Sequence, residues 1–182
     1  QNSLIENGTQ KLLPEKDFVA KLIAAKNAKI NKNFMIIARI EALIAGLGID
    51  EAIKRANAYE KAGADAILIH SKKNTPDEIF EFCDTWDGKI PIIVIPTSYP
   101  NVTLDELQNH KVKMVIYANQ SLRVSHWAMV EYLSKLSTAK SLSDVETKMT
   151  TMEDIFHLQE MYEIKKQEIE IEKNLKKLGY IN

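Results

Sequence analysis

The chain has 182 residues, of which 45% are hydrophobic and 27% charged, the composition of a globular domain with a sizeable core. Its 24 lysines and arginines nearly balance its 25 aspartates and glutamates, so charge gives no reason to expect a nucleic acid or a membrane surface as a partner. The apolar runs are too short to span a bilayer, and a single cysteine cannot form an intramolecular disulfide, so we expect a reducing, cytoplasmic location.

The first part of the chain predicts a loop, a helix and a strand, followed by a second helix. Residues 1–13 are polar and loop-like, and apolar residues then recur at helical spacing from Pro14 to about residue 29. A continuous apolar run over 34–40 predicts a strand that is buried on both faces. Residues 50–62 predict a helix with Asp50 as its N-cap and Gly63 just beyond its end.

The alternation of strand and helix then continues. Further strands are predicted at 64–70, 90–96 and 113–118. The helices between and after them are predicted at 75–85, with Thr75 as cap and Pro76 in the first helical position, at 103–109, with Thr103 as cap, and at 122–136. A charged helix over 152–177 ends the pattern, and its polar face is either solvated or packed against another subunit.

Short apolar strands that alternate with helices indicate an α/β fold with a parallel sheet and right-handed crossovers. Four such units are half of the eight that close a TIM-type barrel. Four units can also form an open doubly wound sheet, but no glycine-rich phosphate loop follows any of the four predicted strands.

Polar side chains follow each of the four predicted strands. The first strand ends in Arg39 and Glu41, the second in His70, the third in Thr97 and the fourth in Asn119. Because the carboxyl ends of parallel strands meet at one rim, we expect these side chains to converge. A guanidinium matches carboxylate or phosphoryl oxygens, and an imidazole can donate to such an oxygen or move a proton near neutral pH. The rim is therefore a predicted site for a small anionic substrate.

Each of these residues taken alone also has a structural explanation. Arg39 could simply pair with Glu41, and His70 could be a hydrogen-bonded histidine of the rim. Their occurrence at successive strand ends favours the functional interpretation. Cys83 lies within a predicted helix and is interpreted as a core residue, and the remaining histidines show no metal-ligand spacing.

Several segments carry a resemblance to a known family. They are 38–46 (Ala-Arg-Ile-Glu-Ala-Leu-Ile-Ala-Gly), 55–59, 62–72, Pro96-Thr97, Tyr117-Ala118-Asn119 and Asn2-Ser3-Leu4. Together they resemble the phosphoenolpyruvate phosphomutase and phosphonopyruvate hydrolase branch of the isocitrate lyase superfamily, over essentially the whole chain. The C–C lyases of that superfamily typically have Thr-Asp after the strand-end arginine, where this chain has Ile40-Glu41, and tend to have an acidic residue in the place of His70. Both departures favour the phosphonate branch.

The resemblance implies a (β/α) barrel of which this chain is the C-terminal half. Residues 1–13 would be the end of a gating loop, 14–150 the half-barrel, and 151–182 a C-terminal helix that is exchanged between the subunits of a homo-oligomer. The implied reaction interconverts phosphoenolpyruvate and phosphonopyruvate, small phosphorylated three-carbon acids, in phosphonate biosynthesis. Arg39 and His70 match the catalytic residues that bind the phosphoryl group, while Asn2, in the gating loop, and Asn119 match substrate-binding positions.

The resemblance also implies a Mg²⁺ ion that holds the pyruvyl oxygens. Its acidic ligands, the aspartate proposed to carry the phosphoryl group, and a lysine just before Asn2 all belong to the N-terminal half, outside these 182 residues. We therefore expect no mutase turnover from these residues alone. Phosphonopyruvate hydrolase, a non-catalytic half-barrel interaction domain, and an aldolase-like barrel for another keto acid are the alternatives.

Overall fold

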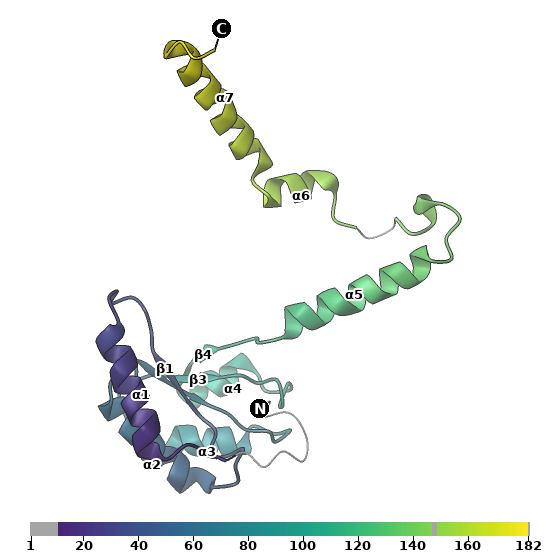
Figure 1. The fold of residues 1–182 in the computed structure, drawn as a ribbon. Helices are drawn as coiled ribbons and strands as arrows, with labels where there is room; N and C mark the ends of the chain where they lie inside the picture. Colours follow the sequence, from purple (N-terminus) through teal and green to yellow (C-terminus); the bar gives the residue numbers. More distant parts are fainter. Residues whose placement is uncertain (1–10, 147–148, 182) are drawn as a thin grey trace. The chain divides into compact units, whose positions relative to one another are not determined.

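A computed structural model describes residues 11–146 and 149–181 of the chain (Figure 1). The chain divides into two compact units, the first ending at Gln120 and the second beginning at Ser121. The boundary at residue 150 between the half-barrel and the C-terminal helix stays a prediction. The helix predicted at 122–136 lies within the second unit.

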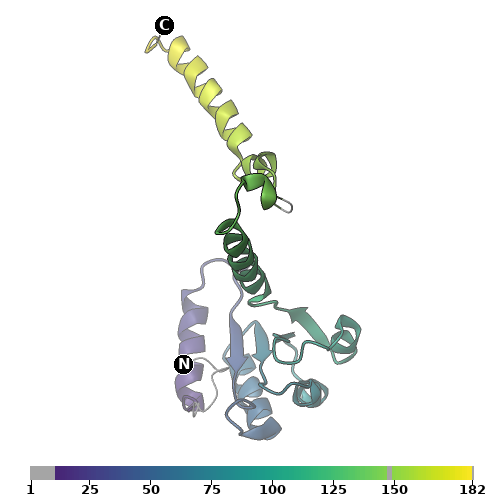
Figure 2. The ribbon, with the colours of Figure 1, turned by 90° about the vertical axis from the view of Figure 1, so that its right-hand side faces the viewer.

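The first unit is built on a parallel sheet with the strand order β1-β2-β3-β4 (Figure 2). Its strands are β1 (Ile37–Ile40), β2 (Ala66–Ile69), β3 (Ile92–Val94) and β4 (Val112–Val115). The helices that precede and connect them are α1 (Glu15–Ala28), α2 (Gly48–Lys61), α3 (Asp77–Thr85) and α4 (Leu104–Asn109). The strands follow one another in sequence order, as in a barrel, whereas the strand order of a doubly wound sheet reverses at a switch point.

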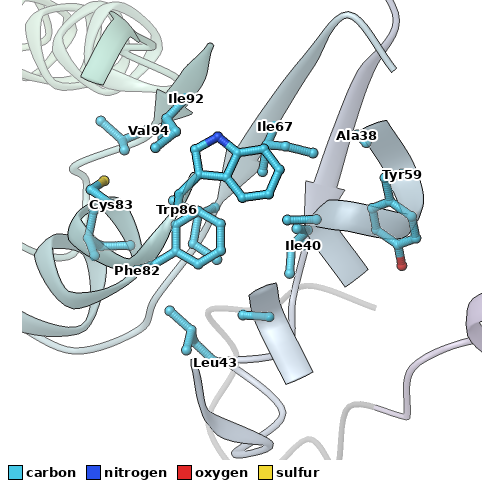
Figure 3. Packing of buried hydrophobic residues seen from close by; sticks show 14 of the residues in the cluster. Ala38, Ile40, Leu43, Tyr59, Ile67, Phe82, Cys83, Trp86, Ile92 and Val94 are labelled. Carbon is cyan, nitrogen blue, oxygen red and sulfur yellow. The ribbon is translucent and has the colours of Figure 1, made fainter. Parts of the chain in front are cut away.

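The main core lies between one face of this sheet and the helices. Strand residues on that face, which include Ile40, Ile67 and Val94, pack with residues of all four helices. Figure 3 shows the rings of Phe82 and Trp86 among these side chains, and the two rings are stacked with their centroids 6.2 Å apart. The burial of these apolar side chains is the main source of stability in such a unit.

The structure confirms that Cys83 is a core residue. Its side chain is fully buried on α3, within the same cluster. Burial, to which the charge of Asp84 adds, raises the pKa of the thiol to about 12. The thiolate is therefore disfavoured, which is the behaviour of an inert structural cysteine.

The other face of the sheet carries a smaller apolar cluster. It consists of Ala66, Leu68 and Ile93, with Ile95 and Ile116 packed against them. Successive side chains of a strand point to opposite faces, so Leu68 lies on this face whereas its neighbours Ile67 and Ile69 face the helices.

A carboxylate ties β1 and β2 together at their amino ends. Asp65 accepts hydrogen bonds from the backbone N–H of Ile36 at 2.8 Å and from Lys29 Nζ at 3.0 Å. The backbone N–H of Asp65 donates in turn to the Ile36 carbonyl at 2.8 Å. These bonds hold the pKa of the Asp65 carboxyl below its ordinary value, with the Ile36 N–H as the largest cause.

The helix starts are predicted correctly in one case and wrongly in two. Thr103 caps α4 as predicted, in a capping box with Glu106. Asp50 is not an N-cap, because α2 already begins at Gly48, which has a positive φ of 77°. Thr75 is not the cap of α3 either. Pro76 occupies that position, and the Thr75 hydroxyl donates to the Asp77 carboxylate at 2.8 Å instead.

The second unit contains the remaining helices, α5 (Gln120–Leu136), α6 (Met152–Leu158) and α7 (Met161–Lys177), with a short 3₁₀ turn over Leu142–Asp144. The single charged helix expected over 152–177 is wrong, because Glu160 adopts the left-handed conformation (φ 54°) and separates α6 from α7. None of the residues of these three helices is buried. Within the described residues, no helix combines the length and the apolar character that crossing a membrane requires.

Candidate active site

The predicted site residues lie near the carboxyl ends of neighbouring strands. Arg39 pairs with Leu68 in the register between β1 and β2, and His70 follows the last residue of β2. Because side chains alternate along a strand, Arg39, Leu68 and His70 belong to the face turned away from the helices. The arginine and the histidine thus come from adjacent strands and share one face of the sheet.

Arg39 is oriented by the carboxylate two residues further on. Its Nε donates a hydrogen bond to Glu41 Oε1, and the two side chains are 40% and 15% exposed, respectively. The ion pair between Arg39 and Glu41, which was one of the two interpretations of the sequence, is therefore present. Such a pair fixes the plane of the guanidinium, which is the group whose fork geometry suits phosphoryl or carboxylate oxygens.

His70 is a buried imidazole with a lowered pKa. Its residue is only 4% exposed, and its Nδ1 has no hydrogen-bond partner within the described residues. Burial is the main cause that lowers the pKa of His70 below its ordinary value of 6.5, the charge of Arg39 lowers it further, and Glu41 acts in the opposite direction. The ring is therefore neutral near pH 7, with one nitrogen as donor and the other as acceptor.

The loop after His70 is held by a fully buried serine. Ser71 Oγ donates to Glu78 Oε2 at 2.7 Å and accepts a hydrogen bond from the Lys73 backbone N–H at 3.1 Å. Glu78 lies in the first turn of α3, so the residue next to His70 is tied to that helix.

The ends of β3 and β4 contribute two further buried oxygens. Thr97 Oγ1 and Asn119 Oδ1 are shielded from solvent and have no hydrogen-bond partner within the described residues. Leaving a buried polar atom without a partner costs about 1–3 kcal/mol, so atoms of this kind are normally satisfied by water, a ligand or another segment. Asn2, the remaining predicted site residue, lies outside the described residues.

A cavity of about 170 Å³ lies beside Arg39 and Glu41. The rest of its lining comes from the segment before α1, from α1 and from α2, namely Lys11, Leu12, Leu13, Phe18, Arg55 and Tyr59. His70, Thr97 and Asn119 are not part of this lining. Arg55 and Tyr59 were not predicted as cavity residues, although the four-residue spacing of Glu51, Arg55 and Tyr59 is a signal that side chains on one helix face interact.

The described part of the chain does not itself provide a metal centre. Among residues 11–146 and 149–181, no group of three or more histidine, cysteine, aspartate or glutamate side chains is placed to hold a metal ion. Mg²⁺ prefers a nearly octahedral set of oxygen ligands, and Glu41 is already engaged with Arg39.

Comparison with known proteins shows the family. The family model described as phosphoenolpyruvate phosphomutase matches residues 2–137. Phosphoenolpyruvate phosphomutase from Tetrahymena pyriformis is 43% identical over 165 residues, which are 91% of this chain and 55% of that protein. Phosphonopyruvate hydrolase from Variovorax sp. (strain Pal2) is 42% identical over 158 residues, which are 86% of this chain and 54% of that protein. The chain thus spans about half the length of these relatives.

Solved structures of the same family resemble this chain. Phosphoenolpyruvate phosphomutase from Streptomyces platensis subsp. rosaceus has a TM-score of 0.88 at 38% identity, over 93% of this chain and 58% of that chain. A phosphonopyruvate hydrolase complex with oxalate and Mg²⁺ has a TM-score of 0.84 at 39% identity, over 91% of this chain and 59% of that chain. The predicted fold class is confirmed: the chain has the fold of the C-terminal half of a TIM-type (β/α)₈ barrel. It belongs to the phosphoenolpyruvate phosphomutase family of the isocitrate lyase superfamily.

Proposed function

We propose that the protein of which this chain is a part interconverts phosphoenolpyruvate and phosphonopyruvate. The observation that carries the proposal is that Arg39 and His70 lie on one face of two adjacent strands, in a chain 43% identical to a phosphoenolpyruvate phosphomutase. In this reaction the bond between phosphorus and C3 of phosphonopyruvate breaks, and phosphorus becomes bonded to the enolate oxygen. The charge that moves with the phosphoryl group sits on its peripheral oxygens, which a preorganised cation and hydrogen-bond donors stabilise.

The site residues divide this work between them. Arg39, oriented by Glu41, binds two phosphoryl oxygens through its fork. His70 remains neutral and donates one N–H to the same group without adding a second full charge to the pocket. Asn119 and Asn2 complete the set of substrate contacts. Catalytic roles for Arg39 and His70 fit a site that is mainly electrostatic, because phosphoryl transfer depends on positioning and charge.

A divalent metal belongs to this proposal. The related hydrolase crystallised with Mg²⁺ and oxalate. When bound, Mg²⁺ would stabilise negative charge on the oxygens of the pyruvyl part of the substrate. We propose that its ligands come from the N-terminal half of the barrel, because the described residues supply no acidic cluster for it.

The second candidate function is phosphonopyruvate hydrolysis, in which water accepts the phosphoryl group and pyruvate is released. The observation in its favour is the 42% identity to a phosphonopyruvate hydrolase, which nearly equals the identity to the mutase. The two reactions share a substrate and differ in the acceptor, so the residues that bind the phosphoryl group serve either one.

Incubation of the complete barrel with phosphonopyruvate and Mg²⁺ separates these functions. The proposal expects phosphoenolpyruvate to form without inorganic phosphate, which ³¹P NMR resolves directly. Pyruvate and phosphate in equal amounts would assign the hydrolase instead. A barrel that binds oxalate but converts nothing would indicate a non-catalytic interaction domain.

We also propose that the protein is a cytoplasmic homo-oligomer in which the second unit packs against another subunit. Its helices α5 and α7 expose large apolar residues, among them Trp127, Val130, Leu133, Ile164 and Ile171. Extensive exposed apolar surface of this kind is a mark of interaction sites. Sedimentation equilibrium of the complete protein is expected to give a dimer or tetramer, and a monomer at micromolar concentration would contradict the proposal.

A further inference from the structure

Arg55 is a buried cation with three hydrogen-bond partners, two on its own helix and one on the segment before α1. Its residue is 8% exposed and lies in the middle of α2. Nε donates to Glu51 Oε1 at 2.7 Å, and Nη1 donates to the Leu13 carbonyl and to the Tyr59 hydroxyl, both at 3.1 Å. Leu13 is 42 positions away in the sequence. Because a buried charge is tolerated only when its partners are well placed, these contacts define where the guanidinium lies.

The partners of Arg55 are themselves held in place. The ring of Tyr59 packs on Phe18 of α1 with the centroids 4.6 Å apart, which orients the hydroxyl that accepts from Arg55. The hydrogen bond from Arg55 is also the largest cause that holds the pKa of Glu51 below its ordinary value, so Glu51 stays charged. The guanidinium is thus directed from two positions on its own helix, four residues to either side.

The third partner belongs to the wall of the cavity beside Arg39 and Glu41. Residues 11–13 form no helix or strand, and they line the same cavity as Arg39 and Glu41. The hydrogen bond from Arg55 to the Leu13 carbonyl attaches this irregular segment to a regular helix. A planar guanidinium can direct donors toward a carboxylate, a hydroxyl and a carbonyl at once, which the single ammonium of lysine does not reproduce.

We propose that Arg55 is a positioning residue that holds residues 11–13 as the wall of the cavity beside Arg39, and thereby shapes the side of the substrate site to which Arg39 belongs. The assignment of the substrate rests on the function proposed above. The attachment of the segment by Arg55 does not, and it can be measured without turnover.

Tryptic cleavage after Lys11, in the complete protein, measures the attachment. Arg55→Met keeps the apolar stem and removes every donor, and we expect cleavage after Lys11 to accelerate about tenfold, the equivalent of one lost hydrogen bond to a charged group. Cleavage after Lys140, in the second unit, is the internal reference. Lys61→Met is the matched control, since Lys61 is an exposed cation in the last turn of the same helix. We expect it to leave cleavage after Lys11 unchanged.

Tyr59→Phe serves where Arg55→Met does not fold, as judged by circular dichroism. It removes only the hydroxyl that accepts from Arg55, and we expect a smaller acceleration of the same cleavage. If both variants are folded and neither accelerates cleavage after Lys11, or if Tyr59→Phe alone is folded and does not, the proposal is wrong.

Steady-state kinetics with phosphonopyruvate measure the consequence for binding. We expect Arg55→Met to raise KM about tenfold and to change kcat by less than about twofold, because a residue that shapes the binding cavity acts on ground state and transition state alike. Arg55→Lys is expected to give an intermediate KM. A fall in kcat at unchanged KM would contradict the positioning role. If the unaltered protein converts no phosphonopyruvate, the proposed function fails, and the tryptic assay still decides whether Arg55 anchors the segment.

Discussion

The hydroxyl of Ser71 donates a 2.7 Å hydrogen bond to the carboxylate of Glu78, and this bond ties the residue beside His70 to the first turn of α3. Ser71 is fully buried, so its hydroxyl has no water to replace a lost partner. The position of the His70 backbone thus depends on a contact that does not involve the imidazole itself.

Glu78→Ala is expected to destabilise the protein by about 1–3 kcal/mol, the cost of leaving a buried hydroxyl without its charged acceptor. Urea unfolding followed by circular dichroism measures the free energy. The control is Lys73→Ala, which removes the ion pair between Lys73 Nζ and Glu78, at 3.5 Å, and leaves the Ser71 hydrogen bond; the Lys73 side chain is 62% exposed. Such an exposed pair contributes at most about 1 kcal/mol, so equal losses in both variants would argue against the role of Ser71.

Arg39→Ala is expected to lower kcat/KM for phosphonopyruvate by about 30- to 1,000-fold, corresponding to about 2–4 kcal/mol for the loss of a preorganised donor. Arg39→Lys keeps the charge but loses the planar fork and the geometry of the pair with Glu41, so we expect it to recover only part of the activity. Turnover close to that of the unaltered protein in Arg39→Ala would remove Arg39 from the mechanism.

The lowered pKa of His70 predicts how the stability of the protein depends on pH. Its pKa in the folded protein lies below 6.5, so the unfolded chain binds more protons in the interval between the two values. The contribution of His70 to stability is therefore complete above pH 6.5 and is lost as the pH falls through that interval. His70→Gln is expected to remove this component from the difference in unfolding free energy between pH 7.5 and pH 5.5. An unchanged difference would show that His70 titrates normally.

Cys83 is expected to be inert toward thiol reagents in the folded protein. With a pKa of about 12 in place of 9.0, its thiolate population is about a thousandfold lower at a given pH, and its burial also blocks access. Ellman's reagent at pH 8 should therefore react with this cysteine only as fast as the protein unfolds. In guanidinium at a concentration that denatures the protein, the reaction should be immediate. Rapid labelling under native conditions would show that α3 opens locally.

Asp65→Asn is expected to cost about 1–3 kcal/mol, because the carboxylate receives the Ile36 N–H and the Lys29 ammonium. The pKa of Asp65 is lowered in the folded protein, so its contribution is present above pH 3.8 and is lost as the pH falls through the lower, folded value. We expect kcat and KM to stay unchanged at 25 °C, since Asp65 lies at the end of the sheet away from the site. A selective loss of kcat would contradict this separation.

The sequence predicts the alternation of elements well because each strand is an apolar run bounded by polar residues. Thr103 with Glu106 three residues later is a capping signal that needs no tertiary context, and the structure confirms it. Asp50 looks similar in isolation, but α2 begins two residues earlier, at Gly48, so Asp50 lies inside its first turn. The break at Glu160 is harder still, because a left-handed conformation at a residue other than glycine leaves no reliable local signal.

Part of the candidate site can also be predicted from the sequence. Parallel strands bring their carboxyl ends together, so Arg39 and His70 can be assigned to one rim from strand order and alternation alone. The cavity is different, because the contact between Arg55 and Leu13 spans 42 residues. Local spacing on α2 predicts the contacts of Arg55 with Glu51 and Tyr59, but only the packing of α1 on α2 brings the third partner within reach.

The hydrogen bonds of Asp65 separate two requirements of the first unit. They hold β1 and β2 together at the amino ends of the strands, whereas Arg39 and His70 lie towards the carboxyl ends. A substitution in the loops that follow the strands therefore leaves the contacts of Asp65 in place. We expect the register of β1 and β2 to tolerate such changes.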